Sequence, residues 1–215
     1  MAFTGRQHEI DVLFSELNTV KESGEGRFVW LRGRRRVGKS RLVQEFCNRA
    51  NVPYAFYQAP RREHAGALSA FTKAIALSSL PVADAFDGVS HPSWPSAIRA
   101  SIREIDPAQP AILVIDELPY LAELDPGFTA DLQMAWDRML ERAPVLLICI
   151  GSDVRMMEVM VEARSPLFGR PTREMRVPAR APCVTTIWRG ALLLPRDLPG
   201  ARLAPGIGTR IPDAE

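Results

Sequence analysis

The sequence has few cysteines and no long apolar run, and both features exclude classes of protein. Cys47, Cys149 and Cys183 are odd in number and lack metal-ligand spacing, which rules out a disulfide framework and disfavours a Cys/His zinc site. We expect Cys47 and Cys149 to be small buried hydrophobic residues. No stretch of eighteen apolar residues occurs, and charges near the N-terminus stand where a signal peptide needs apolar residues. These absences predict a cytoplasmic protein with no membrane partner.

Most of the chain has no excess of either positive or negative residues. Of the 215 residues, 47% are hydrophobic and 24% are charged, which is enough for one domain with a real core. Residues 1–170 carry 20 Lys and Arg against 21 Asp and Glu, whereas residues 171–215 carry 7 against 4. This balance does not require a nucleic-acid partner, although Arg34 to Arg36 and the pair Arg61 and Arg62 could form a local basic patch.

Predicted strands and helices alternate along the chain. Helical spacing of apolar residues predicts helices over 5–22, 64–79, 93–105, 127–142 and 153–162, with a loop over 80–92. Another helix is predicted after the Gly/Arg-rich turn, where Leu42, Val43, Phe46 and Ala50 recur at helical period. Short apolar or alternating runs predict strands over 27–32, 53–58, 111–115, 145–150 and 172–177. Several of these strands are continuously apolar, which is typical of strands buried on both faces. The pattern predicts an α/β fold of three layers, in which helices cover both faces of a parallel sheet.

The composition changes abruptly after Pro178. Residues 171–215 contain seven prolines and show no sustained helical period, and Pro and Gly recur every few residues from 190 onward. We therefore expect a core over residues 1–178 and a Pro/Arg-rich, poorly ordered tail over residues 179–215.

The central motif is a phosphate-binding loop. Residues 33–40 (GRRRVGKS) match G-x-x-x-x-G-K-[ST] between a predicted strand and a predicted helix. Gly33 and Gly38 let the backbone wrap around phosphate oxygens, while the helix that follows points its positive end at them. Lys39 is predicted to bridge the β- and γ-phosphates, and Ser40 to offer its hydroxyl to Mg²⁺. The remaining nucleotide-binding candidates of this segment are Arg34, Arg35, Arg36, Val37 and Arg41.

Two carboxylates follow the apolar strand over 111–115. Asp116 and Glu117 stand at its C-terminal end, the edge at which α/β sheets bind ligands. We expect Asp116 to hold Mg²⁺, directly or through water, and Glu117 to orient and deprotonate an attacking water.

Two further positions have open interpretations. Ser152 follows the strand over 145–150, where it could contact the γ-phosphate or the attacking water, or instead cap the next helix. Arg170 could stabilise phosphate charge, within the chain or from a neighbouring molecule, or be a solvated surface residue.

Several segments resemble a known family in order and spacing. They are F-T-G-R-x-x-E at 3–9, GRRRVGKSRL at 33–42, ILVIDELPYL at 112–121, LQMAWDRML at 132–140, ICIGSDVRMME at 148–158 and SPLFGRPT at 165–172. Over residues 3–178 the chain resembles the archaeal-type ATPase family, part of the STAND group of signal-transduction P-loop ATPases related to the AAA+ class.

The resemblance implies a P-loop NTPase sheet of strand order 5-1-4-3-2 and ATP as the nucleotide. It also implies that Arg6 lies near the adenine-side entrance and that Ser152 and Arg170 belong to sensor and lid-facing elements. Members of the family normally continue into a helical lid and a winged-helix module. Because this chain enters the Pro/Arg-rich tail instead, we hypothesise that its reading frame was lost near residue 180, which an intact lid sequence in another frame would support.

The motifs favour the Mg²⁺-dependent ATPase core of a STAND-type switch that hydrolyses ATP slowly if at all. One alternative is a nucleic-acid-associated or protein-interaction module in which the nucleotide is only regulatory. Besides ATP, the partner could be another protein or a second copy of the chain. A second alternative is a small-molecule phosphotransferase, which Glu117 argues against because a carboxylate suits activation of water.

Overall fold

The structure is a computed structural model that describes residues 5–59 and 64–179. The strands are β1 (Arg27–Arg32), β2 (Tyr54–Gln58), β3 (Ala111–Asp116), β4 (Val145–Gly151) and β5 (Arg173–Arg176). The α-helices are α1 (Gln7–Ser23), α2 (Lys39–Ala50), α3 (His64–Ala76), α4 (Trp94–Ile102), α5 (Leu118–Leu124), α6 (Phe128–Arg138) and α7 (Val154–Val159). The expected tail, from residue 180 onward, and the pair Arg61 and Arg62 lie outside the described residues.

The strands form one five-stranded parallel sheet in the order β2-β3-β4-β1-β5. Read from β5, this is the order 5-1-4-3-2 that the family resemblance implies. Every residue of β3 and β4 is buried, because both strands have neighbours on each side and helices on each face. The predicted α/β class is therefore confirmed.

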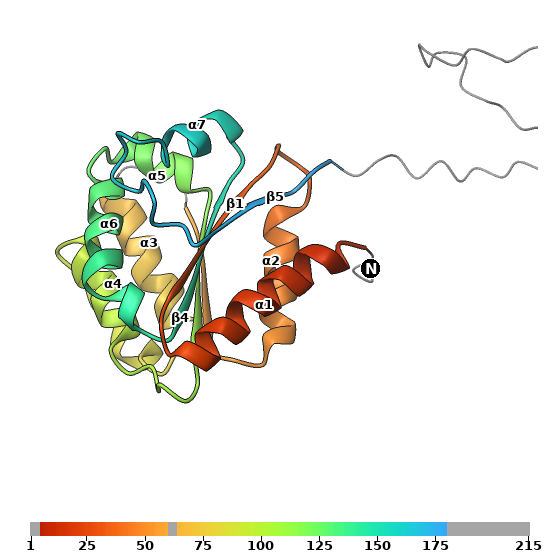
Figure 1. Ribbon diagram of the computed structural model, residues 1–215. Helices are drawn as coiled ribbons and strands as arrows, with labels where there is room; N and C mark the ends of the chain where they lie inside the picture. Colours follow the sequence, from red (N-terminus) through yellow and green to blue (C-terminus); the bar gives the residue numbers. More distant parts are fainter. Residues whose placement is uncertain (1–4, 60–63, 180–215) are drawn as a thin grey trace, which may run out of the picture. The chain divides into compact units, whose positions relative to one another are not determined.

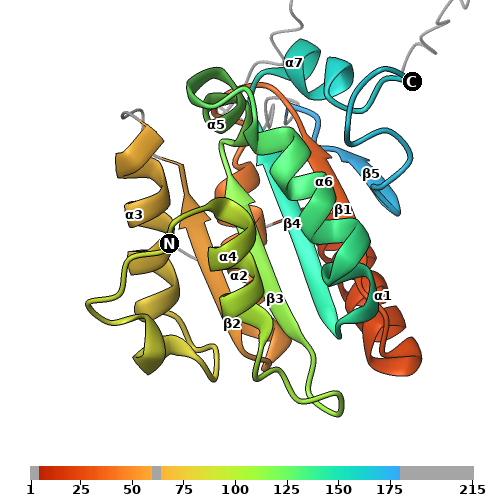
Figure 2. The same cartoon turned by 90° about the vertical axis from the view of Figure 1, so that its left-hand side faces the viewer.

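Helices cover both faces of the sheet, as Figures 1 and 2 show. On one face, α1 and α2 bury Leu13, Leu17 and Phe46 against the sheet. On the other face, a larger cluster joins α3, α4, α5 and α6 to the sheet, with Trp94 and Phe128 in edge-to-face contact at 4.8 Å between ring centres. The three-layer arrangement follows from strands that are apolar on both sides.

Three details differ from the sequence-based expectation. Helix α5 was not predicted; it is a single short segment that begins with Leu118 and Pro119, where proline suits a first turn. The helix expected over 127–142 ends at Arg138, because the Met139 backbone leaves the helical region at φ −140° and a short 3₁₀ turn follows. The loop over 80–92 contains another 3₁₀ turn, Ala83–Phe86.

Two further observations concern the cysteines and the length of the helices. Cys47 and Cys149 are buried thiols, as expected. Within residues 5–59 and 64–179, no helix has both the length and the apolar character needed to cross a bilayer.

The topology brings the predicted motifs to one edge. Strand β4 lies between β1 and β3, so the carboxyl ends of these three strands are adjacent. The phosphate loop follows β1, and Ser152 follows β4. Asp116 is the last residue of β3, and Glu117 comes directly after it. Parallel strands therefore collect residues from distant parts of the sequence at a single edge.

Candidate nucleotide-binding site

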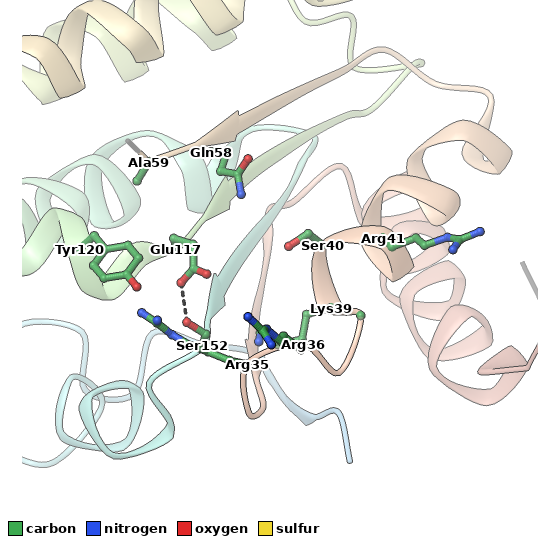
Figure 3. A pocket seen from close by; sticks show the side chains of 11 residues that line it. Arg35, Arg36, Lys39, Ser40, Arg41, Gln58, Ala59, Glu117, Tyr120 and Ser152 are labelled. Carbon is green, nitrogen blue, oxygen red and sulfur yellow. Dashed lines mark hydrogen bonds between the residues drawn. The ribbon is translucent and has the colours of Figure 1, made fainter. Parts of the chain in front are cut away.

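A cavity of about 560 Å³ opens at this edge of the sheet. Its lining, shown in Figure 3, consists of Arg35, Arg36, Gly38, Lys39, Ser40, Arg41, Gln58, Ala59, Glu117, Tyr120 and Ser152. Basic side chains of the loop and of the first turn of α2 lie opposite the acidic strand end. The cavity thus combines cations and helix-terminal N–H groups, which suit a phosphate, with a carboxylate that suits water or a metal ion.

The loop between β1 and α2 has the backbone shape that its glycines permit. Gly38 adopts φ +86° as the N-cap of α2, and Arg36 adopts φ +63°. A Cβ on Gly33 would lie 2.5 Å from the carbonyl oxygen of Val177, so only glycine fits this approach. The segment after β5 therefore packs directly on the start of the loop.

Lys39 is held by the loop itself. Its Nζ donates hydrogen bonds to the carbonyl oxygens of Gly33 at 2.8 Å and of Arg34 at 3.1 Å. Burial lowers the pKa of Lys39, while the nearby carboxylates of Glu117 and Asp116 oppose that shift. Gly33 and Arg34 thus contribute backbone carbonyls to the site, and the ammonium rests on acceptors that phosphate oxygens can replace.

Asp116 is buried with one oxygen unpaired. The side chain is 1% exposed, and its Oδ1 accepts the Glu117 N–H at 2.9 Å. Among the described residues, Oδ2 has no hydrogen-bond partner. Burial raises the pKa of Asp116, whereas a hydrogen bond from Ser40 acts in the opposite direction. A hard cation such as Mg²⁺ takes oxygen ligands, so the unpaired carboxylate oxygen beside the Ser40 hydroxyl fits this ion.

Glu117 is fixed at both its backbone and its side chain. Its backbone adopts φ +58° at the N-cap of α5, and its Oε2 accepts a hydrogen bond from the Ser152 hydroxyl at 2.7 Å (Figure 3). The N-cap of α7 is Asp153, whose side chain accepts the Met156 N–H at 2.9 Å. The alternative that Ser152 caps this helix is therefore wrong, because Asp153 already fills that role.

Arg6 contacts the phosphate loop from outside the cavity. Its guanidinium donates to the carbonyl oxygens of Val37 at 2.9 Å and Pro178 at 2.8 Å, and pairs with Glu9 at 3.0 Å. Arg6 therefore links the start of α1, the phosphate loop and the segment after β5. Val37 contributes to this link through its backbone carbonyl. The predicted place of Arg6 at the adenine-side entrance stays a prediction.

Arg170 does not join the other predicted residues. Its guanidinium makes a two-pronged contact with Asp137, at 3.2 and 3.1 Å. Thr172, two residues later, bonds Phe28 near the amino end of β1, opposite the edge that carries the phosphate loop. The expectation of a nucleotide contact by Arg170 within the same chain is therefore corrected, because the loop before β5 starts at the wrong end of the sheet.

Sequence reasoning missed Gln58, Ala59 and Tyr120. Gln58 lies beside Asp116 in the register of β2 and β3, so the shared carboxyl edge was a usable signal once the neighbours of β3 were known. Tyr120 lies in α5, which was not predicted. Its ring lies under the Arg35 guanidinium, with 5.7 Å between Cζ and the ring centre.

Comparison with known proteins identifies a family and several similar folds. Residues 3–177 match a family described as an ATPase domain predominantly from Archaea. An uncharacterized protein of Methanocaldococcus jannaschii is 25% identical over 177 residues, which are 81% of this chain and 35% of that protein. The chain thus spans about a third of the length of this relative.

Solved structures share the fold at low identity. A Walker-type ATPase of Pyrococcus abyssi has a TM-score of 0.54 at 20% identity, covering 82% of this chain and 54% of that one. The Aeropyrum pernix ORC2 protein, solved as ADPNP-ADP complexes, has a TM-score of 0.57 at 16% identity, with 82% and 48% covered. Drosophila ORC bound to DNA scores 0.56 at 13% identity, with 82% and 43% covered.

Proposed function

Because this chain belongs to the family of ATPase domains found predominantly in Archaea, we propose that it binds ATP with Mg²⁺ and hydrolyses it slowly. The cavity at the carboxyl edge of the sheet is the proposed site. The observation that carries the proposal is the buried, unpaired Oδ2 of Asp116 beside the phosphate loop. A buried carboxylate oxygen without a partner is costly unless a ligand satisfies it.

Binding uses the loop and its lysine. The N–H groups of the loop and of the first turn of α2 surround the phosphates, since the helix N-terminus carries partial positive charge. Lys39 leaves the carbonyls of Gly33 and Arg34 and bonds β- and γ-phosphate oxygens. The lining residues Arg36 and Arg41 add positive charge at the rim of the cavity.

Ser40 and Asp116 are the proposed holders of Mg²⁺. Bound there, this ion would supply positive charge that offsets the charge of the phosphates. Burial raises the pKa of Asp116, and a cation held there would favour the charged carboxylate.

Hydrolysis rests on Glu117. Its carboxylate orients an attacking water and accepts a proton from it, and the hydrogen bond from Ser152 sets the direction of the carboxylate. In the present structure both Lys39 and Glu117 are engaged with protein groups that they must leave or share. This competition supports slow turnover, as expected of a STAND-type switch in which ATP binding orders the loop and hydrolysis releases it.

The test measures Mg·ATP binding to the full 215-residue chain by calorimetry and hydrolysis in the same preparation. We expect binding by the wild type, no detectable binding by Lys39→Ala, and loss of the Mg²⁺ dependence in Ser40→Ala. Circular dichroism checks that both variants fold. A folded wild-type protein that binds no nucleotide would contradict the proposal, and phosphate transfer to an added alcohol would favour a phosphotransferase.

Association with DNA is the second candidate function. One structural neighbour, Drosophila ORC, is bound to DNA, and Arg34 and Arg36 are exposed on the phosphate loop. In this proposal the nucleotide only regulates binding to DNA, to another protein or to a second copy of the chain. Binding to duplex DNA that weakens with salt at a slope of several phosphate contacts would support it.

A further inference from the structure

Arg35 differs from its neighbour Arg34 in where its side chain lies. Arg35 lines the cavity, whereas Arg34 does not. Figure 3 shows the Arg35 side chain reaching from the phosphate loop toward Tyr120, past the pair formed by Glu117 and Ser152. Its guanidinium carbon lies 5.7 Å from the centre of the Tyr120 ring. The loop therefore delivers a guanidinium to the side of the cavity where the carboxylate of Glu117 stands.

The contact of Arg35 with Tyr120 is weak enough to be exchanged. Arg35 is exposed, and no carboxylate within the described part of the chain forms an ion pair with it. A cation over an aromatic ring at an exposed site contributes less than a charge-assisted, two-pronged bond from arginine to phosphate. A phosphate group in the cavity would therefore draw Arg35 away from the ring.

A second observation concerns charge. Arg35 and Lys39 both line the cavity, so two cationic side chains lie at its wall. An anion between them would interact with both charges, and the γ-phosphate of ATP is the anion that the loop motif predicts there.

We propose that Arg35 is a catalytic residue that binds the non-bridging oxygens of the γ-phosphate, so that the chain supplies its own arginine for hydrolysis. This inference rests on the proposed function of the same site. In the reaction, the water oxygen bonds to the γ-phosphorus, and the bond from that phosphorus to the oxygen bridging to the β-phosphate breaks. One water proton passes to Glu117 and then to the released phosphate. Arg35 exchanges no proton; it stabilises the charge of the transferring phosphoryl group.

The experiment uses the full chain and compares wild type with Arg35→Ala and Arg35→Lys. Arg103→Ala is the control, because it removes an exposed arginine whose ion pair, with Glu104 at 3.0 Å, does not involve a residue that lines the cavity. Three quantities are measured: kcat, the Kd for Mg·ADP, and the Kd for Mg·ADP with aluminium fluoride, which imitates the transferring phosphoryl group. The last quantity reports on the transition state even where turnover is very slow.

For Arg35→Ala we expect kcat and the affinity for the fluoride complex to fall at least about tenfold. Loss of an arginine that stabilises the transferring phosphoryl group lowers the rate by roughly 10³-fold or more in other enzymes of this chemistry. Affinity for Mg·ADP should stay within about twofold, since ADP lacks the γ-phosphate. Arg35→Lys should recover part of the loss, because it keeps the charge but not the planar fork. Arg103→Ala should resemble the wild type.

Two results overturn the proposal while leaving the proposed function intact. One is a kcat unchanged in Arg35→Ala; the other is an equal loss of affinity for Mg·ADP and for the fluoride complex, which would indicate a role in loop structure. A wild type that binds neither complex would refute the proposed function, and this inference with it.

Discussion

At the scale of single residues, Asp116 combines burial with an unpaired oxygen. The side chain is 1% exposed, and burial raises its pKa despite the hydrogen bond from Ser40. Removing a charged carboxylate from water costs free energy that only a ligand or a proton recovers. Asp116 therefore lowers the stability of the ligand-free protein at neutral pH.

Asp116→Asn should raise the free energy of unfolding at pH 7 by roughly 0.5–2 kcal/mol while it abolishes Mg²⁺-dependent nucleotide binding. Because the raised pKa lets the folded state bind the proton before the unfolded state does, wild-type stability should rise relative to the variant as the pH falls through that raised pKa. The gain ends near the ordinary value of 3.8, where the unfolded chain is also protonated. Urea unfolding across this range measures the effect, with exposed Asp87→Asn as the control; an Asp116→Asn protein less stable than wild type at pH 7 would disprove it.

Ser152 sets the direction of Glu117 through one hydrogen bond of 2.7 Å. In Ser152→Ala the carboxylate loses this donor, so we expect kcat to fall about tenfold with little change in the Kd for Mg·ADP. Asp153→Ala is the matched control: it removes the cap of the neighbouring helix α7 and should cost about 1 kcal/mol of stability without the same loss of kcat. Equal kinetic effects of the two substitutions would indicate a merely structural role for Ser152.

At the scale of elements, the phosphate loop is confined between β1, α2 and the segment after β5. Gly33 lies against the carbonyl oxygen of Val177. The backbone N–H of Val177 in turn donates a hydrogen bond to the carbonyl oxygen of Arg32 at 2.8 Å. Arg6 bonds the same loop through Val37 and the same segment through Pro178. The loop shape therefore depends on elements at both ends of the described chain.

Gly33→Ala should destabilise the protein by about 1–3 kcal/mol, because its Cβ would lie 2.5 Å from a backbone oxygen that cannot move without shifting β5. It should also weaken Mg·ATP binding by distorting the loop. Gly24→Ala adds the same methyl group in open space at φ +71°, far from the cavity, and should cost about 1 kcal/mol with no change in affinity. Denaturant unfolding and calorimetry of both variants test this; an unchanged affinity in a folded Gly33→Ala protein would refute it.

At the scale of the whole molecule, one ligand should stabilise the entire three-layer core. The strands that end at the cavity, β1, β3 and β4, are also the buried centre of the sheet. A ligand that binds only the folded chain therefore opposes global unfolding and not merely local motion of the loop.

Mg·ATP at about one hundred times its Kd should add roughly 2.7 kcal/mol and raise the melting temperature by about 5–10 °C for a core of this size. Differential scanning calorimetry with and without the ligand measures the shift. Lys39→Ala should show none under the same conditions, and a wild-type melting temperature that ignores Mg·ATP would contradict a working site.

Local patterns in the sequence were sufficient to predict most of the secondary structure and the phosphate loop. Apolar runs and helical spacing predicted each strand and most helices, since burial on one or two faces dictates which positions are apolar. The order of residues 33–40 predicted the phosphate loop because its backbone shape depends on glycines that are neighbours in the chain. The carboxylates Asp116 and Glu117 followed from their place at the end of an apolar strand.

Only the tertiary structure decided how these parts meet. The bond from Ser152 to Glu117, the approach of Arg35 to Tyr120, the neighbourhood of Gln58 and Asp116, and the separation of Arg170 from the cavity all depend on strand order and register. Such contacts join residues tens of positions apart, and their distances are set by the packing of the whole sheet and not by any local run. The sequence therefore determined which groups are present, and the fold determined which of them can act together.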